Sequence, residues 1–518
     1  MIENPRGVNK KEILSRYFTN PGGRVTSVTD AMPNVNAAAV TARASRAEER
    51  DVTELYWKEF SEKMGGDVIN RILNEFGDDS VREDASGYVM VKGVSVLTSM
   101  EMFRHPLITG IEASTRYINW GKLSEEGFAV WPEVIMNDPE AKAAYEIAML
   151  VVQNTYRQLW PKLWDHIAVS NPRREGQSES AYKLAVKGAV CDALRGLLPL
   201  GTRTNFAIHA NYRAFSELVM NARASEFQET HEVADEIATE LKKVNPHFIE
   251  VVDGPHGPEW SNYRQITNKI LKKFGSTDVL KATRNDPALS VKTEILNAKW
   301  LNDLLREALV FKNGELSDRD DWELNRQFLT SGKLTNLLTA LGEARTNRRH
   351  KVPDFFNAVY LRIRFENLSF GSFKDYNRHR LLQSKSEPDW TGERGFVIPK
   401  EVEELGGLVK EAYVNAQKVL AEARRSIAKK YPTESSLLLT HGTKTSFEGV
   451  MGLGELFWIA ELRSDASNNP ENRKIAIAMY QGIIEKLPML KNFKNFVDTN
   501  EYSLGRIREA VRADLKGK

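Results

Sequence analysis

The chain of 518 residues contains a single cysteine, Cys191. One thiol excludes an intramolecular disulfide and any zinc site built from several cysteines. Long apolar runs are also missing, since no stretch approaches the roughly 18 residues that a membrane helix needs, and the N-terminal MIENPRGVNKKEILSRYFTN has no apolar segment typical of a signal peptide. Net charge is only +2, which by itself calls for neither nucleic acid nor membrane. We therefore expect a cytoplasmic protein that does not bind membranes.

Repeated motifs are the most informative feature that the chain does have. GTRTNF at Gly201–Phe206 recurs as GTKTSF at Gly442–Phe447. An Arg-His pair at residues 104–105 has a counterpart in the Arg-His-Arg at residues 378–380. Because the motifs occur in the same order twice, they indicate two diverged copies of one domain, and the period is too long for a solenoid.

Hydrophobic alternation adds a third repeated signal. Apolar residues recur with period two over residues 87–94 and 358–365, which predicts a strand before each Arg-His. We predict one copy over residues 1–260 and a second over residues 261–518. The junction is expected within Asp253–Ser276, where the prolines and glycines of DGPHGPEW are typical of a linker.

Helical spacing of apolar residues predicts most of the remaining structure. It extends over residues 138–168, 178–198, 404–430 and 472–487. Each copy is therefore expected to be α+β, with long helices packed on a small sheet. The lone GLG at Gly452–Gly454 follows no strand–helix–strand pattern and is too weak to indicate a dinucleotide site.

The stretch FRHPLITGIEASTRYINW is unusually dense in polar groups, and its proline and glycine predict an irregular, extended path. Arginine forks suit phosphate oxygens, a serine with its neighbouring amides can cradle an anion, and a tyrosine can stack on a planar ring. A carboxylate can accept imide or hydroxyl protons. Together with one downstream arginine, these side chains indicate a site for a phosphorylated, planar ligand: Arg104, Glu112, Ser114, Arg116, Tyr117 and Arg195.

These motifs resemble those of the flavin-dependent thymidylate synthase family. The family signature is Arg-His-Arg followed by Glu-x-Ser-x-Arg-Tyr, which is similar to Arg104-His105-Pro106 and Glu112–Tyr117 here. GDDSVRED at Gly77–Asp84 resembles the flavin-side segment of the family, and residues 195–223 continue the similarity. Because the second copy keeps its own Arg-His-Arg, the resemblance implies a tandem version of this α+β domain.

The resemblance implies methylation of dUMP to dTMP with FAD as cofactor, and methylenetetrahydrofolate and NADPH as co-substrates. No protein nucleophile and no metal are then required. The family positions imply three catalytic residues, namely Arg104, Glu112 and Arg223. The implied nucleotide-binding residues are Arg104, Glu112, Ser114, Arg116, Tyr117, Arg195, Arg223 and Arg463. The implied FAD-binding residues are Ser45, Ser80, Glu83, His105, Asn211, Arg213, Arg378, His379 and Arg380.

Several positions depart from the family pattern. Pro106 replaces the last arginine of the first Arg-His-Arg, Asp78 replaces a histidine, and Glu101 stands where the family often has glutamine. In the second copy the nucleotide motif is absent from residues 386–390. These departures leave two alternatives open: the same fold acting on another pyrimidine nucleotide, or a non-catalytic paralogue that binds nucleotide or flavin.

Structural explanations also stand beside the functional ones. Arg195 has an ion-pair partner available in Asp192, one turn earlier on the expected helix. His379 can be a satisfied structural histidine, and Cys191 is expected to be a small core residue.

The expected partner is another copy of the chain. Since the first copy keeps the nucleotide residues and the second the Arg-His-Arg, we expect a homodimer with four domain copies and complementary sites. Nucleic acid is a weaker alternative, because acidic stretches dilute the basic segments TNRRHK and KDYNRHR.

Overall fold

The computed structural model describes residues 9–45, 47, 51–60, 79–173, 175, 177–275, 288–297, 331–502 and 504–505. It folds as two compact units that interleave along the chain. The first unit comprises Met1–Val94, Glu101–Glu112 and Thr204–Thr277. The second unit comprises Ser95–Met100, Ala113–Arg203 and Asp278–Lys518. Among the helices of the described ranges, none is both long and apolar enough to cross a membrane.

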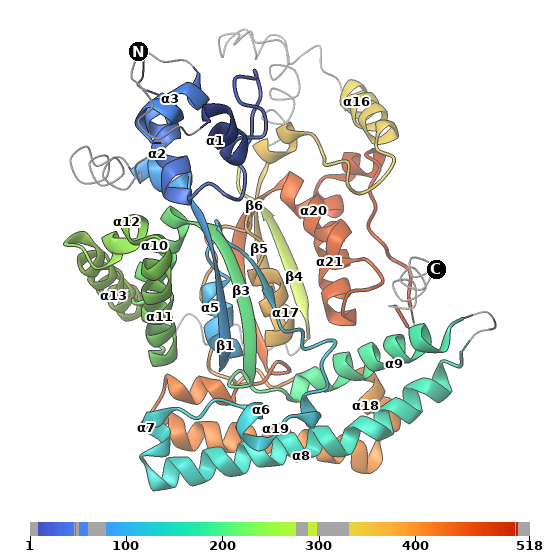
Figure 1. The fold of residues 1–518 in the computed structure, drawn as a ribbon. Helices are drawn as coiled ribbons and strands as arrows, with labels where there is room; N and C mark the ends of the chain where they lie inside the picture. The colour runs from blue at the N-terminus through green and yellow to red at the C-terminus, as the bar shows by residue number, and fades with distance from the viewer. Residues whose placement is uncertain are drawn as a thin grey trace. The chain divides into compact units, whose positions relative to one another are not determined.

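The first unit is built on a three-stranded sheet in the order β1-β3-β2 (Figure 1). Its strands are β1 (Ser86–Ser95), β2 (Thr109–Glu112) and β3 (Arg203–Asn211). β2 runs antiparallel to β3, with Ile111 opposite Ala207. Buried and less buried residues alternate along β3, as expected for a strand with one face on a core.

Helices complete the first unit and supply most of its core. They are α1 (Lys10–Tyr17), α2 (Asn34–Ala44), α3 (Val52–Glu59), η1 (Asp79–Glu83), α10 (Tyr212–Ala222), α11 (Gln228–Val244), α12 (Pro246–Ile249), η4 (Glu250–Val252) and α13 (His256–Gly275). Phe215, Ile237 and Phe248 are almost fully buried in this core. Tyr212 is buried beside them, and its hydroxyl accepts a hydrogen bond from the side chain of Asn245 at 2.8 Å.

The second unit contains an antiparallel sheet in the order β4-β5-β6 (Figure 1). Its strands are β4 (Ser290–Ile295), β5 (Tyr360–Ser369) and β6 (Lys444–Gly452). Phe365 pairs with Phe447 across β5 and β6, and the register shifts between Phe365 and Leu368. Asn367 lies in this bulge with φ of 57°, a left-handed conformation that asparagine tolerates better than most residues. The sheet contacts α17 (Phe370–Asn377), α20 (Leu453–Arg463) and α21 (Pro470–Lys486).

Two long helices, α8 (Pro139–Ser170) and α19 (Gly407–Ala428), lie against one another in the second unit (Figure 1). The side chain of Asp138 caps α8 by accepting bonds from the amides of residues 140 and 141. The other helices of this unit are η2 (Trp120–Lys122), α6 (Glu125–Phe128), α7 (Glu133–Met136), α9 (Glu179–Leu194), η3 (Arg195–Leu197), α16 (Ser331–Ala344), η7 (Asp354–Ala358), α18 (Lys400–Leu405), η8 (Glu434–Leu438) and η9 (Pro488–Asn492). α5 (Val96–Met102) begins in the second unit and ends in the first.

The predicted elements are confirmed, apart from the linker. The strands expected over residues 87–94 and 358–365 are β1 and β5, and long helices cover all four segments with helical spacing. The α+β class is therefore correct. The residues expected to form a linker, Asp253–Ser276, are mostly helical, because α13 fills most of them, and the place of the junction stays a prediction. Pro258 lies in the first turn of α13, where a missing amide hydrogen breaks no helical bond. The boundary at residue 260 stays a prediction.

Candidate active site

Two predicted catalytic residues of the first unit, Glu112 and Arg223, are held by neighbours of that unit. Glu112 lies at the end of β2, where its side chain accepts a hydrogen bond from Thr204 at 3.4 Å. Arg223 follows α10 and contacts Asp235 at 2.7 Å and Asp253 at 2.9 Å. It also donates to a backbone carbonyl of η4 at 2.7 Å. Arg223 therefore joins the end of α10 to α11 and η4. Arg104 is partly buried. The catalytic roles of Arg104, Glu112 and Arg223 stay predictions.

Three of the predicted flavin residues form one ionic chain in the first unit. Arg213 contacts Glu83 at 2.6 Å and Glu217 at 3.8 Å, and Glu217 contacts His105 Nε2 at 3.2 Å. Because His105 Nδ1 accepts from the amide of Leu107, Nε2 must carry the proton that bonds to Glu217. Burial lowers the pKa of His105, against the opposing effect of Glu217.

The other flavin residues of the first unit are not brought into this chain. Asn211 accepts from the amide of Ala214 at 2.8 Å and so caps α10. Ser45 is exposed at the end of α2, where its hydroxyl donates to a backbone carbonyl. Ser80 is exposed on η1, and the departing position Asp78 lies outside the described residues.

Arg116 of the predicted phosphate motif lies in the second unit and forms a two-pronged ion pair. Its Nε donates to one oxygen of Asp192 at 2.7 Å, and its Nη2 to the other at 2.9 Å. Nη2 also donates to the carbonyl of Ser467 at 2.9 Å. The Ser114 hydroxyl accepts from the amide of Arg116 at 3.2 Å, so the motif turns back on itself. Tyr117, next along the motif, is exposed.

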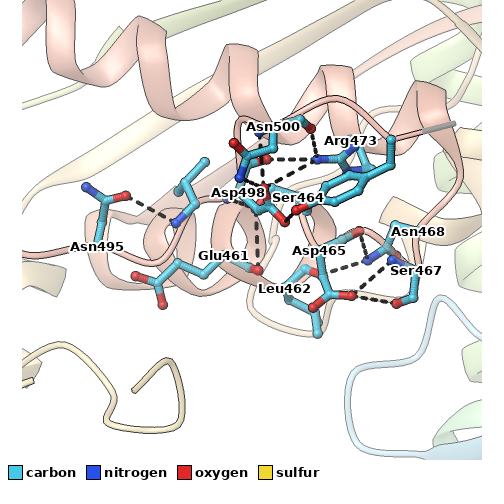
Figure 2. Close-up of polar contacts among 12 residues, drawn as sticks. Glu461, Leu462, Ser464, Asp465, Ser467, Asn468, Arg473, Asn495, Asp498 and Asn500 are labelled. Carbon is cyan, nitrogen blue, oxygen red and sulfur yellow. Dashed lines mark hydrogen bonds and ion pairs between the residues drawn. The ribbon is translucent and has the colours of Figure 1, made fainter. Parts of the chain in front are cut away.

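The loop that presents the Ser467 carbonyl is fixed by its own side chains. Figure 2 shows Asp465 accepting bonds from the amide and hydroxyl of Ser467, at 3.0 and 2.7 Å. In the same view Asn468 donates to the carbonyl of Leu462 at 2.9 Å. This loop follows α20, which ends at Arg463. The contacts hold the acceptor of Arg116 close to the end of that helix.

Among the described residues, Arg195 is one of the most buried cations, at 5% exposure. Its Nη1 lies 3.4 Å from Asp375 Oδ2, and its Nη2 has no acceptor among the residues that the structure describes. A side chain at Gly371 would come within about 3.0 Å of Nη2, so the guanidinium lies close against the backbone of α17 at this glycine. Asn472 donates to the same Asp375 oxygen at 2.6 Å.

Arg463 joins this group from the end of α20. Its Nη2 donates to the backbone carbonyl of Asp375 at 2.8 Å, and its Nε to His379 Nε2 at 3.0 Å. An accepting Nε2 requires a neutral imidazole, consistent with burial and Arg463 lowering the pKa of His379 to about 3. His379 Nδ1 lies 3.8 Å from Glu455, and burial raises the pKa of that carboxyl to about 7.

The second unit thus gathers three arginines around Asp375, and we call Arg116, Arg195, Arg463, Asp192 and Asp375 the arginine cluster. Burial would raise the pKa of Asp375, but the three guanidiniums outweigh it and hold the pKa well below its usual range. The five side chains together carry one net positive charge, which suits an anionic ligand. Of the Arg-His-Arg, His379 bonds to this cluster, whereas Arg378 is partly buried and Arg380 is exposed.

Sequence analysis missed Asp375, and the alternative pairing of Arg195 with Asp192 is not the one that the structure has, while the nucleotide-binding role of Arg195 stays a prediction. Asp192 pairs with Arg116 and not with Arg195. One signal pointed to Asp375: it precedes Arg378 by three residues, as Glu101 precedes Arg104. The expectation for Cys191 is confirmed, since the residue is fully buried.

Two segments of the chain match one known protein family. The sequence profile described as thymidylate synthase complementing protein matches residues 27–247 and 329–489. A UPF0159 protein of Chlamydia muridarum is 25% identical over 97% of this chain and 97% of its own length. A UPF0159 protein of Thermoplasma acidophilum is 25% identical over 93% of this chain and 99% of its own length.

Flavin-dependent thymidylate synthases are also among the similar proteins. That of Mycobacterium sp. strain JLS is 30% identical over 30% of this chain and 57% of its own length. The solved structure of the Helicobacter pylori enzyme with FAD and dUMP shares 16% identity over 42% of this chain and 93% of that chain, with a TM-score of 0.28. The two matched segments together span more than half of the chain. The chain therefore belongs to the thymidylate synthase complementing protein family, as a tandem form with two family segments.

Proposed function

We propose that this chain is a flavin-dependent enzyme that methylates dUMP to dTMP. Methylenetetrahydrofolate would supply the one-carbon unit that replaces hydrogen at C5 of uracil, and NADPH the reducing equivalents. The observation that carries the proposal is the arginine cluster. It joins Arg116 and Arg195, from the first family segment, to Arg463, from the second, around the carboxylate of Asp375.

The arginine cluster is suited to the phosphate of a nucleotide. Arg195 has an unused Nη2, and guanidinium groups bind phosphate oxygens with paired hydrogen bonds. Ser114 and Tyr117 flank Arg116 in the motif, and we assign them to phosphate and base contacts. Arg104, Glu112 and Arg223 are proposed to contact the nucleotide as catalytic residues.

The first-unit residues also suit the polar part of FAD. Arg213 and Glu83 are each more than 40% exposed, and exposed ion pairs contribute at most about 1 kcal/mol. A diphosphate can therefore replace Glu83 on Arg213 at little cost, with the hydroxyls of Ser45 and Ser80 as further donors. His105 and Asn211 of the first unit belong to the proposed set of flavin residues, as do Arg378, His379 and Arg380 of the second unit. Bound FAD would supply the redox chemistry of the transfer.

The departures from the family motifs favour a second candidate, a shifted pyrimidine nucleotide. Pro106 removes a cation from the first Arg-His-Arg, and Glu101 places a carboxylate where the family often has glutamine. A non-catalytic paralogue that binds nucleotide or flavin is the remaining alternative. We further propose that the protein is cytoplasmic and forms a homodimer with four domain copies.

Flavin content and turnover together test the proposal. The purified chain should show the absorbance of oxidised flavin or acquire it with added FAD. With methylenetetrahydrofolate and NADPH, it should then release tritium from dUMP labelled at C5. Release from another labelled pyrimidine nucleotide, but not from dUMP, would select the second candidate. A colourless protein that binds no added FAD would leave only the non-catalytic paralogue.

A further inference from the structure

Asp375 is the carboxylate at the centre of the arginine cluster. It stands on α17, two residues before the end of that helix, and its side chain is 25% exposed, whereas that of Arg195 is only 6% exposed. The carboxylate is therefore the more accessible of the two partners.

The cluster still has hydrogen-bonding capacity to offer a ligand. Arg195 Nη2 is buried without an acceptor among the described residues, and so is Asn472 Oδ1 without a donor. Buried polar atoms are normally satisfied, so the unused guanidinium nitrogen leaves a hydrogen bond that an anion could accept. Asp375 uses only part of the hydrogen-bonding capacity of Arg195, because the contact between the two side chains is long, at 3.4 Å.

We propose that Asp375 determines the charge preference of this site, as an internal anion that competes with the nucleotide phosphate for Arg195. The inference rests on the proposed nucleotide function and deepens it. The carboxylate balances the guanidiniums when no ligand is present. When phosphate enters, the same charge opposes it and lowers affinity for nucleotide relative to nucleoside.

Asparagine is the matched substitution at this position. Asp375→Asn keeps the size of the side chain and an oxygen that can accept from Asn472. Only the charge is lost. Asp375→Glu keeps the charge, and Asp138→Asn removes a carboxylate elsewhere in the second unit, at a helix cap that asparagine also fills well.

Calorimetry with three probes tests the proposal: dUMP, deoxyuridine and sulfate, a dianion that does not titrate near neutral pH. Asp375→Asn should bind dUMP and sulfate at least about tenfold more tightly, since like charges a few ångströms apart repel strongly in a partly buried site. Deoxyuridine affinity should stay within about twofold. Asp375→Glu and Asp138→Asn should show no gain for any probe.

Unfolding temperature provides a second readout. Without anions, Asp375→Asn should unfold at a lower temperature than the wild type, because three guanidiniums lose a counter-charge, and sulfate should restore more stability to it than to the wild type. If Asp375→Asn does not fold, Asp375→Ser removes the same charge and should show the same gain.

Weaker or unchanged dUMP and sulfate binding in the neutral variants would overturn the inference and make Asp375 a structural residue that positions Arg195. The proposed function fails separately. If no form turns over dUMP and yet Asp375→Asn gains sulfate affinity, the internal anion stands and the enzyme assignment falls. If the wild type turns over dUMP but Asp375→Asn gains no sulfate affinity, the enzyme assignment stands and the inference about Asp375 falls.

Discussion

Replacing Arg116 with alanine should reduce both folding stability and nucleotide affinity. The guanidinium donates two bonds to Asp192 and one to the carbonyl of Ser467, at 2.7 to 2.9 Å. The side chains of Arg116 and Asp192 are only 18% and 13% exposed. Removing one partner of a fully buried pair costs about 3–5 kcal/mol. Because some solvent reaches this pair, we expect a loss of about 2–3 kcal/mol in the free energy of unfolding.

The two losses can be separated by a second substitution. Most of the stability loss comes from the uncompensated charge of Asp192, so adding Asp192→Asn to Arg116→Ala should recover more than half of it. Nucleotide affinity should not recover, because the guanidinium is still missing. Losing hydrogen bonds to a charged group costs about 1.5–3 kcal/mol, which is a ten- to hundredfold weaker dUMP complex at about 1.4 kcal/mol per tenfold.

Urea unfolding and calorimetric titration of dUMP would measure the two quantities. Wild-type protein should bind dUMP far more tightly than deoxyuridine, and Arg116→Ala should lose most of that difference. Arg157→Ala is the matched control: Arg157 is a partly buried arginine that donates to the carbonyls of Gly121 and Leu123. It should lose stability without losing dUMP affinity. Our reasoning is refuted if Arg116→Ala binds dUMP within twofold of wild type, or if the double variant is no more stable than the single one.

Three further predictions follow from the site. Cys191→Ala should retain turnover within about a few-fold, since the proposed chemistry uses no thiolate; a folded, flavin-loaded but inactive variant in steady-state assays would contradict this. Arg378→Ala and Arg380→Ala should weaken FAD binding in fluorescence titrations while one dUMP site per chain remains, and two equivalent dUMP sites would refute the proposed division between the copies. Glu455→Gln concerns pH: burial raises the carboxyl pKa from 4.5 to about 7, so with rising pH the unfolded state releases this proton first. The contribution of Glu455 to the free energy of unfolding therefore falls as the pH rises from 4.5 to about 7. Relative to wild type, the Gln variant should be more stable at pH 7.5 than at pH 4.5 by about 3 kcal/mol. Denaturation at both values measures the difference, and a constant difference would argue against the raised pKa.

The sequence by itself determined the secondary structure around the site and the likeness to the family. Period-two alternation predicted β1 and β5, and helical spacing predicted α8 and α21, because both patterns arise from neighbouring residues on one face of an element. The expected linker failed for a related reason. Proline and glycine at the start of a helix look the same in sequence as they do in a loop, and α13 begins among them.

Only the tertiary structure decided how the charges pair. Asp192 stands three residues before Arg195, a spacing that favours an ion pair on a continuous helix, but α9 ends at Leu194 and Arg195 begins a 3-10 turn. Arg195 instead lies beside Asp375, 180 residues further along the chain, and Asp192 pairs with Arg116. Which carboxylate meets which guanidinium depends on how α17 and the loop after α20 pack. Such contacts join distant segments, and no local spacing reports them.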